Sequence, residues 1–322
     1  MKKLIFKNKK QKKKKEKIKN MQKMNNSQKI LLLGANGQLG YELNKSLGFL
    51  GNVIATTRQQ CDLTDLQALS HTISQIRPNV IINATAYTAV DKAEQDDAQA
   101  FKVNCNALAH LAACAKQQKA LLIHYSSDYV FDGTKPRAYV ETDSTNPLNV
   151  YGQSKLSGEN EIMRSGAKAL IFRTSWVFGS HGNNFVKTVL RLAKEREVLS
   201  IVDDQIGCPT PAEMLAEATL LALYKLFNNE NCCITSPQLY HLTSSEAVSW
   251  YDFARYIVQT AKNLGFAIKA KTINAIPSSD YPTPAKRPLN SVLDCQKFQK
   301  DFGVILPSWK KYIESVLLAA KV

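Results

Sequence analysis

The feature that most constrains this fold is a short apolar run followed at once by three closely spaced glycines. Residues 30–33 are apolar throughout, which is typical of a central parallel strand buried on both faces. Gly34, Gly37 and Gly40 follow, and the apolar spacing from Leu39 onward indicates a helix. Glycines let the backbone turn sharply and approach a pyrophosphate, whose charge the helix N-terminus favours. The spacing differs from the common G-x-G-x-x-G fingerprint, and a tight turn without a ligand is the alternative. We predict a nucleotide-binding turn.

Strand and helix patterns then alternate as far as residue 180. Strands are expected at 52–57, 80–82, 121–125 and 170–172, and helices up to Ile76 and over 96–118. A capping box of Thr64 and Gln67 is expected to start the helix that ends at Ile76. This order predicts an α/β protein with a doubly wound, Rossmann-like parallel sheet. Ligands of such sheets bind at the carboxyl ends of the strands, which nominates residues 84–86, 126–128 and 174–176.

The pattern loosens after residue 180. Helices are expected at 185–195, 211–227, 249–264 and 307–319, and short strands at 199–202 and 239–242. We interpret residues 29–180 as a dinucleotide-binding domain, to which segments near 199–227 and 239–243 could add. Residues 181–322 are expected to form mainly a smaller, mixed α/β lobe that binds the substrate.

The charge of the chain is concentrated at its start. The net charge is +15, but the first 29 residues hold thirteen lysines and one acid, Glu16, which leaves the rest nearly balanced. A balanced body does not indicate nucleic-acid binding. We expect residues 1–28 to be a disordered basic extension; a tether to acidic surfaces and an early start codon, with Met21 or Met24 as later starts, are alternatives.

No stretch has the length and apolarity of a membrane span, so no membrane partner is expected. The seven cysteines form no C-x-x-C pair, which is typical of a reduced, cytoplasmic protein. The histidine spacing indicates no metal site.

A tyrosine and a lysine stand four residues apart, at Tyr151 and Lys155. On a helix they would share one face, about one turn apart. An ammonium near a phenol favours the phenolate, so we expect a lowered pKa for Tyr151 and a role in proton transfer to a substrate oxygen. The spacing alone is weak evidence, because many surface helices carry it by chance.

The glycine spacing together with Tyr151 and Lys155 resembles the extended short-chain dehydrogenase/reductase superfamily. Longer strings resemble one family within it, the dTDP-4-dehydrorhamnose reductases, over residues 29–310. These strings are residues 83–94 (NATAYTAVDKAE), 127–133 (SDYVFDG), 147–152 (PLNVYG), 173–177 (RTSWV), 182–185 (GNNF) and 204–210 (DQIGCPT).

The resemblance implies a role for each matching residue. NADPH or NADH would lie over the glycine turn with Gln38 and Leu39, and the C4 ketone of dTDP-4-dehydro-β-L-rhamnose would be reduced. Tyr151 would donate the proton, Lys155 would hold the nicotinamide ribose, and Ser127 would bond the ketone. Some family members are metal-linked dimers, so a homodimer and Mg²⁺ are implied by resemblance only. The other implied contacts are Asp62 and Leu63 near the adenine, Ala84, Thr85 and Ala86 along the cofactor, and Asp128 and Trp176 on the sugar.

Arg58 stands where a ribose-binding acid often ends the second strand. Without the acid a 2′-phosphate is not repelled, and Arg58 could pair with it, so we expect NADPH to be used at least as well as NADH. Each of three residues has an alternative without a ligand. Arg58 could be a solvated turn residue, Trp176 could be part of the core, and Asp128 could cap a loop. Lys286 and Arg287 could bind the diphosphate of the substrate, or they could be a solvated pair in a loop.

Two other functions stay open at this level. Related sugar-nucleotide dehydratases carry Asp-Glu after the fourth strand, and Ser127-Asp128-Tyr129 lacks that glutamate, which argues against dehydration. A non-catalytic regulatory subunit, such as the related β subunit of methionine adenosyltransferase, is one alternative. A reductase of a neighbouring 6-deoxy-4-ketosugar is the other. Cys208 is interpreted as a packing residue, because no histidine is close in sequence to activate it.

Overall fold

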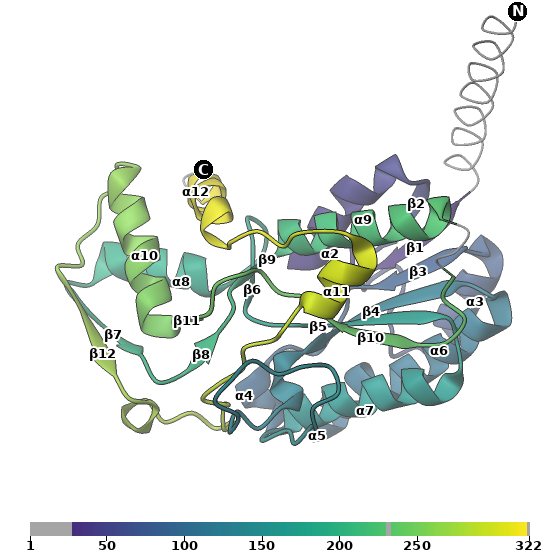
Figure 1. Cartoon of the computed structure of the whole chain (residues 1–322), viewed down its shortest axis with the longest axis horizontal. Helices are drawn as coiled ribbons and strands as arrows, with labels where there is room; N and C mark the ends of the chain where they lie inside the picture. The colour runs from purple at the N-terminus through teal and green to yellow at the C-terminus, as the bar shows by residue number, and fades with distance from the viewer. Residues whose placement is uncertain (1–27, 230–232, 321–322) are drawn as a thin grey trace, which may run out of the picture.

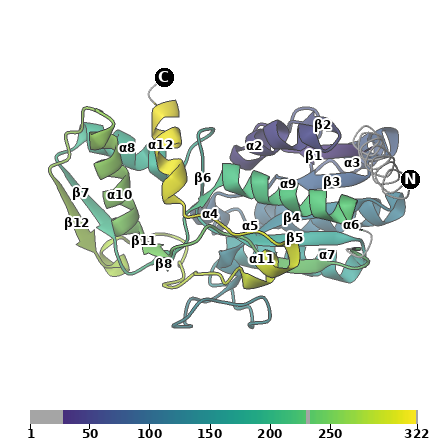
Figure 2. The same ribbon diagram turned by 45° about the horizontal axis from the view of Figure 1, so that its top comes forward.

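The computed structural model describes residues 28–229 and 233–320. The predicted basic extension, residues 1–28, therefore lies outside the described residues apart from Gln28. Figure 1 shows a larger lobe built on a central sheet beside a smaller lobe that contains α8, α10 and α12, and Figure 2 shows the same division from another side.

The larger lobe is built on a six-stranded sheet in the order β10-β5-β4-β3-β1-β2, with every pair parallel. The predicted doubly wound sheet is thereby confirmed. Its strands are β1 (Lys29–Leu33), β2 (Asn52–Thr56), β3 (Val80–Asn83), β4 (Leu121–Ser127), β5 (Ala169–Thr174) and β10 (Gln238–His241).

Alternating side chains of β1 explain why the sheet is covered on both faces. Ile30 and Leu32 point into one apolar cluster, and Leu31 and Leu33 point into another. The first cluster is completed by α2 (Gln38–Ser46), η1 (Leu47–Phe49), α9 (Ala212–Asn228) and α11 (Gln296–Phe302). The second is completed by α3 (Leu66–Ile76), α6 (Ala107–Gln118) and α7 (Val150–Ser165).

Three local predictions for this lobe need correction. The capping box of Thr64 and Gln67 is wrong: Asp65 caps α3 by accepting the Ala68 amide, while the Thr64 hydroxyl bonds Asp62. The helix expected over 96–118 consists of α5 (Asp97–Phe101), a π-helical segment η2 (Lys102–Asn106) and α6. Strand β4 runs two residues further than expected, so Ser126 and Ser127 belong to the strand.

The smaller lobe packs around its own apolar cluster, with Phe253, Trp309 and Phe178 among its buried rings. Strand β7 pairs in parallel with β12. Strand β10 belongs to the central sheet, where it pairs with β5, although in sequence it comes after the first helix of the smaller lobe. The elements of this half are α8 (Phe185–Glu195), β7 (Val198–Val202), α10 (Trp250–Asn263), β12 (Thr272–Ile276), η4 (Ser278–Asp280) and α12 (Lys310–Ala319).

Short segments join the two lobes. Two-stranded pairings connect β6 (Val177–Phe178) with β9 (Thr210–Pro211), and β8 (Ile206–Gly207) with β11 (Val248–Ser249). A short helix α4 (Val90–Ala93) follows β3, and a 3-10 turn η3 (Asp128–Val130) follows β4. Both lie after the carboxyl ends of central strands, where the sheet topology predicts a ligand.

Candidate active site

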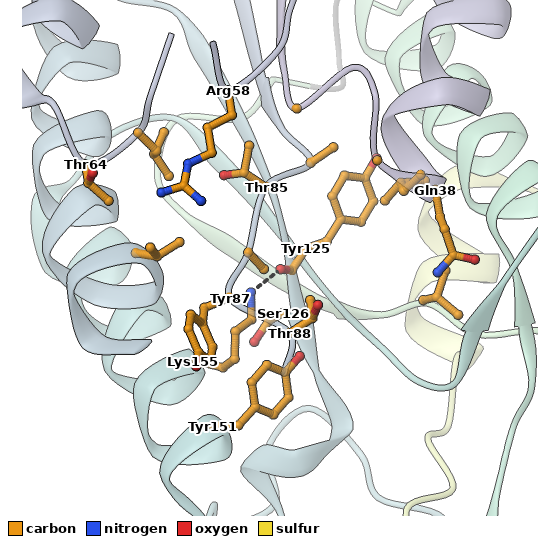
Figure 3. A pocket seen from close by; sticks show the side chains of 18 of the residues that line it. Gln38, Arg58, Thr64, Thr85, Tyr87, Thr88, Tyr125, Ser126, Tyr151 and Lys155 are labelled. Atoms are coloured by element: carbon orange, nitrogen blue, oxygen red, sulfur yellow. Dashed lines mark hydrogen bonds between the residues drawn. The ribbon is translucent and has the colours of Figure 1, made fainter. Parts of the chain in front are cut away.

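A cavity of about 770 Å³ opens at the carboxyl ends of the central strands, and Figure 3 shows its interior. Of the predicted cofactor-binding residues, all but Gly40 line it. These residues are Gly34, Gly37, Gln38, Leu39, Arg58, Asp62, Leu63, Ala84, Thr85, Ala86, Tyr151 and Lys155.

The glycine turn is shaped so that a ligand can approach its backbone. Gly34 has φ +83°, a conformation that L side chains rarely adopt. Gly40 lies under the turn, where a Cβ would stand 2.0 Å from the carbonyl oxygen of Gly34. Gly37 caps α2 without a side-chain hydrogen bond, so the first amides of the helix face the cavity uncapped. This arrangement fits a dinucleotide pyrophosphate.

The rim of the cavity carries the pair Arg58 and Asp62. Arg58 Nε donates to Asp62 Oδ2 at 3.1 Å, and the arginine side chain is 73% exposed. Hydrogen bonds from the Thr64 amide and hydroxyl, with the Arg58 charge in addition, lower the pKa of Asp62. The carboxylate is therefore anionic and holds Arg58 in place at the cavity, where Figure 3 shows the arginine side chain.

Tyr151 and Lys155 lie one turn apart on α7 and both line the cavity. Asn149 caps α7 by accepting the Gly152 amide at 2.8 Å. Gly152 lies against the chain of Tyr129, where a Cβ would stand 2.2 Å from the carbonyl oxygen, so the helix start is held close to η3. The sequence prediction that these two side chains share one helix face toward the ligand agrees with this placement.

The expected lowering of the Tyr151 pKa by Lys155 is wrong for this state of the protein. Burial raises the pKa of Tyr151 to about 12, partly offset by the Ser127 hydroxyl. Burial also lowers the pKa of Lys155 to about 8. The amine donates to the carbonyl oxygen of Tyr125 at 2.7 Å (Figure 3), so its hydrogen bond goes to β4 rather than to the phenol. Tyr151 is thus a protonated phenol at neutral pH.

Ser127 and Asp128 lie beside Tyr151 and outside the residues that line the cavity. The Ser127 hydroxyl donates to Asp128 Oδ1 at 3.0 Å and accepts the Tyr129 amide. Asp128 is buried, and burial raises its pKa to about 7. Its Oδ2 atom is buried and makes no hydrogen bond of good geometry within the described residues, although the Ser291 hydroxyl lies close enough to lower the pKa in part.

Trp176 is placed at the junction of the lobes rather than in the cavity. Its ring stacks on Trp250 with centroids 3.4 Å apart, and its edge lies against Gly207, where a Cβ would stand 2.5 Å away. Its φ of +45° is uncommon for a bulky residue and marks a strained position. The ring is half-exposed.

Sequence reasoning missed several residues that line the cavity. Tyr87 and Thr88 belong to the string at 83–94, which follows a predicted strand and could have nominated them. The others come from the glycine turn, the segment after β2, α4, α5 with its N-cap, the π-helical segment, β4 and β6, and their places depend on packing. Ser126 and Thr174, nominated by their places at strand ends, do line the cavity. The missed residues are Asn36, Cys61, Thr64, Tyr87, Thr88, Lys92, Asp96, Gln99, Val103, Tyr125 and Val177.

Of the remaining candidates, Arg287 and Cys208 are held by protein groups, and Lys286 is bonded through its backbone while its side chain is exposed. Arg287 pairs with Asp91 at 2.8 Å, and the carbonyl oxygen of Lys286 accepts from Asn149. Cys208 is buried and burial raises the pKa of its thiol to about 11, as expected for a packing residue.

Within residues 28–229 and 233–320, no helix combines the length and apolarity needed to cross a membrane. In the same residues, no three His, Cys, Asp or Glu side chains gather in a way that could hold a metal ion.

Comparison with known proteins identifies the family. Residues 28–322 match the family model described as the RmlD substrate binding domain. The dTDP-4-dehydrorhamnose reductase of Burkholderia thailandensis is 46% identical, with 88% of this chain and 95% of the relative covered. The enzyme of the same name from Escherichia coli is 44% identical, with 89% and 96% covered. The crystal structure of the Bacillus anthracis enzyme in complex with NADP superimposes with a TM-score of 0.81 at 32% identity, with 90% and 99% covered. The chain therefore belongs to the dTDP-4-dehydrorhamnose reductase family.

Proposed function

We propose that this protein reduces the C4 ketone of dTDP-4-dehydro-β-L-rhamnose to dTDP-β-L-rhamnose, the last step of dTDP-rhamnose synthesis, with NADPH or NADH. The observation that carries the proposal is that Tyr151 and Lys155 line the same cavity as the glycine turn. Curated relatives of the same name are 44–46% identical over most of the chain. Retention of the acid, the lysine and Ser127 favours catalysis over a regulatory role.

The geometry supports Tyr151 as the general acid. The bound nicotinamide cofactor supplies the hydride, and negative charge then develops on the sugar's O4. Tyr151 is protonated at neutral pH because burial raises its pKa to about 12, so it can donate a proton to that oxygen. Ser127, next to the phenol, would donate to the same oxygen once its hydroxyl turns away from Asp128 Oδ1, and the Asp128 carboxyl would then be left to meet a sugar hydroxyl.

Cofactor choice would depend on Arg58. Its guanidinium is exposed at the cavity mouth and pairs with Asp62 through Nε, so its terminal nitrogens remain to meet a 2′-phosphate. The relative from Bacillus anthracis was solved with NADP. We therefore propose that NADPH is used at least as well as NADH.

We further propose that residues 181–322 form most of the sugar-nucleotide side of the site, with Trp176 stacked on Trp250 at the lobe junction. A homodimer and a cytoplasmic location remain predictions. The described cysteines, all unpaired, support a reducing compartment. Size-exclusion chromatography with light scattering would measure the oligomeric state.

The test is the loss of NADPH absorbance when purified protein meets the ketosugar nucleotide. Tyr151→Phe removes the proton donor but keeps the ring, so kcat should fall by about 10²–10⁴ while the Kd for NADPH stays within about twofold. Tyr224→Phe, a change on an exposed tyrosine of α9, is the matched control.

A Tyr151→Phe variant with normal turnover would show that another group is the acid. Wild-type protein that binds NADPH and leaves the ketosugar unchanged would favour the regulatory role. Product stereochemistry, read by NMR, separates rhamnose from the talose epimer that a neighbouring reductase would form.

A further inference from the structure

A buried chain of hydrogen bonds runs from the cavity wall to Lys155. The amide and hydroxyl of Thr85 bond Asn83 Oδ1 at 3.1 and 2.6 Å. Asn83 Nδ2 lies 3.2 Å from His124 Nδ1, and His124 Nε2 lies 3.2 Å from Lys155 Nζ. Asn83, His124 and Lys155 are each about 1% exposed. Nothing in the proposed reaction uses Asn83 or His124.

The backbone amide of Thr85 sets the direction of this chain. An amide N–H can only donate, so it faces the oxygen of Asn83, and the NH₂ group of Asn83 must face His124. His124 is neutral, because complete burial by itself holds its pKa well below the ordinary value, whatever the charge of Lys155. A neutral ring that accepts at Nδ1 carries its proton on Nε2.

The Nε2–H of that tautomer points at Lys155 Nζ. An ammonium has three N–H donors and no lone pair, so an ammonium at Lys155 would place a donor 3.2 Å from the Nε2–H donor of His124. An uncharged amine has a lone pair and can accept from Nε2–H. In the other tautomer the ring proton is on Nδ1, where it would face the NH₂ donor of Asn83. We propose that His124 is a positioning residue which presents Nε2–H to Lys155 and so makes the uncharged amine easier to form in the cofactor-free protein.

The other charges around Lys155 do not remove this bias. Glu159 on the same helix favours the ammonium, but it is buried in a bidentate pair with Arg173 of β5. Across the cavity, the acids are paired with cations as well. The titratable and charged groups nearby are Tyr151, Glu159, Glu161 and Arg164 on α7, Asp128 in η3, Cys105 in the π-helical segment, and the pairs Lys92–Asp96 and Arg58–Asp62.

The first experiment needs neither substrate nor turnover, so its result is independent of the proposed function. Long-range ¹H–¹⁵N NMR of cofactor-free protein labelled with ¹⁵N-histidine shows which ring nitrogen of each of the five histidines is protonated. The His124 signal is assigned by its loss in His124→Gln or, if that variant does not fold, by elimination with Gln variants of the other four histidines, His71, His110, His181 and His241. At pH 9, where the Lys155 amine is mostly uncharged, we expect the proton on Nε2. A proton on Nδ1, or on both nitrogens, would overturn the proposal.

The second experiment reverses the chain. In Asn83→Asp a carboxylate accepts from Nδ1–H, so Nε2 becomes an acceptor and favours the ammonium. An ammonium attracts the anionic cofactor, so the charged form of Lys155 should persist to higher pH in this variant. The pH at which kcat/KM for NADPH begins to fall, which starts the basic limb of the profile, should therefore rise by about one unit or more. On this limb, kcat/KM at a given pH should then be about tenfold higher than in the wild type. His110→Gln, which alters a histidine bonded to Ser70, should leave the limb in place.

An unmoved limb in Asn83→Asp would contradict the proposed order of hydrogen bonds. The double variant Asn83→Asp with His124→Phe distinguishes an effect relayed through His124 from direct attraction between the new carboxylate and Lys155. We expect the shift to shrink at least threefold in the double variant, and an equal shift would show that the carboxylate acts without the histidine.

Discussion

Gly40 in the larger lobe and Gly207 at the lobe junction both leave no room for a side chain, but for different reasons. A Cβ at Gly40 would meet the carbonyl oxygen of Gly34, six residues away in one strand–turn–helix unit. A Cβ at Gly207 would meet the ring of Trp176, which belongs to a different strand connection and is held by Trp250. The glycine turn of the cofactor cavity is thus built locally, whereas the proposed sugar side is built by contacts between distant segments.

The largest effect is expected at Gly40. Gly40→Ala places a Cβ 2.0 Å from a backbone oxygen that cannot move without opening the turn, so the Kd for NADPH should rise about 100-fold or more, measured by fluorescence titration. Gly48→Ala, where a Cβ meets nothing within 4 Å, should bind normally. Normal binding by Gly40→Ala would show that the turn does not hold the cofactor.

The next effect concerns Asp128, which we propose to face the sugar. Burial raises its pKa to about 7 from the ordinary 3.8, so the folded protein binds the proton more tightly than the unfolded chain. Its contribution to stability is therefore present at low pH and is lost as pH rises through about 7. In Asp128→Asn this loss should disappear. Between pH 5 and pH 8 the free energy of unfolding, measured in urea, should fall by about 2 kcal/mol more in the wild type than in the variant. Equal pH dependence in both proteins would mean that Asp128 is charged when folded.

A smaller effect is expected at Gly207, and it tests the comparison directly. Gly207→Ala pushes on the edge of Trp176, so KM for the sugar nucleotide should rise about tenfold while the Kd for NADPH stays unchanged. Steady-state kinetics at saturating NADPH measure the first, and the titration used for Gly40→Ala measures the second. Loss of NADPH affinity here would show that the two sides are not separable.

The smallest effect is expected at Arg58. Because the side chain is exposed, Arg58→Ala should raise KM for NADPH only about three- to tenfold, and leave KM for NADH unchanged. Comparison of the two cofactors under the same salt conditions measures the change. An equal loss for both cofactors, or a wild-type preference for NADH, would refute a 2′-phosphate contact.

Most of the sheet and the cofactor side could be predicted from sequence, because their signals are local. The apolar run before Gly34 and the residues after β3 place Gly37 and Thr85 at the carboxyl ends of adjacent strands. The start of α3 was misplaced by one residue, since the Asp65 carboxylate competed with Thr64 for the free amides. The π-helical segment had no recognisable pattern.

The sequence by itself determined the strand–turn–helix that fits a dinucleotide, the spacing of Tyr151 and Lys155, and the family. Only the tertiary structure decided the protonation of that pair. A pKa depends on burial and on hydrogen bonds from other elements, and here β4 accepts the bond of Lys155 while burial keeps Tyr151 neutral. The same holds for the direction of the Thr85–Asn83–His124 chain, because it depends on three strand ends and a helix meeting in one buried place.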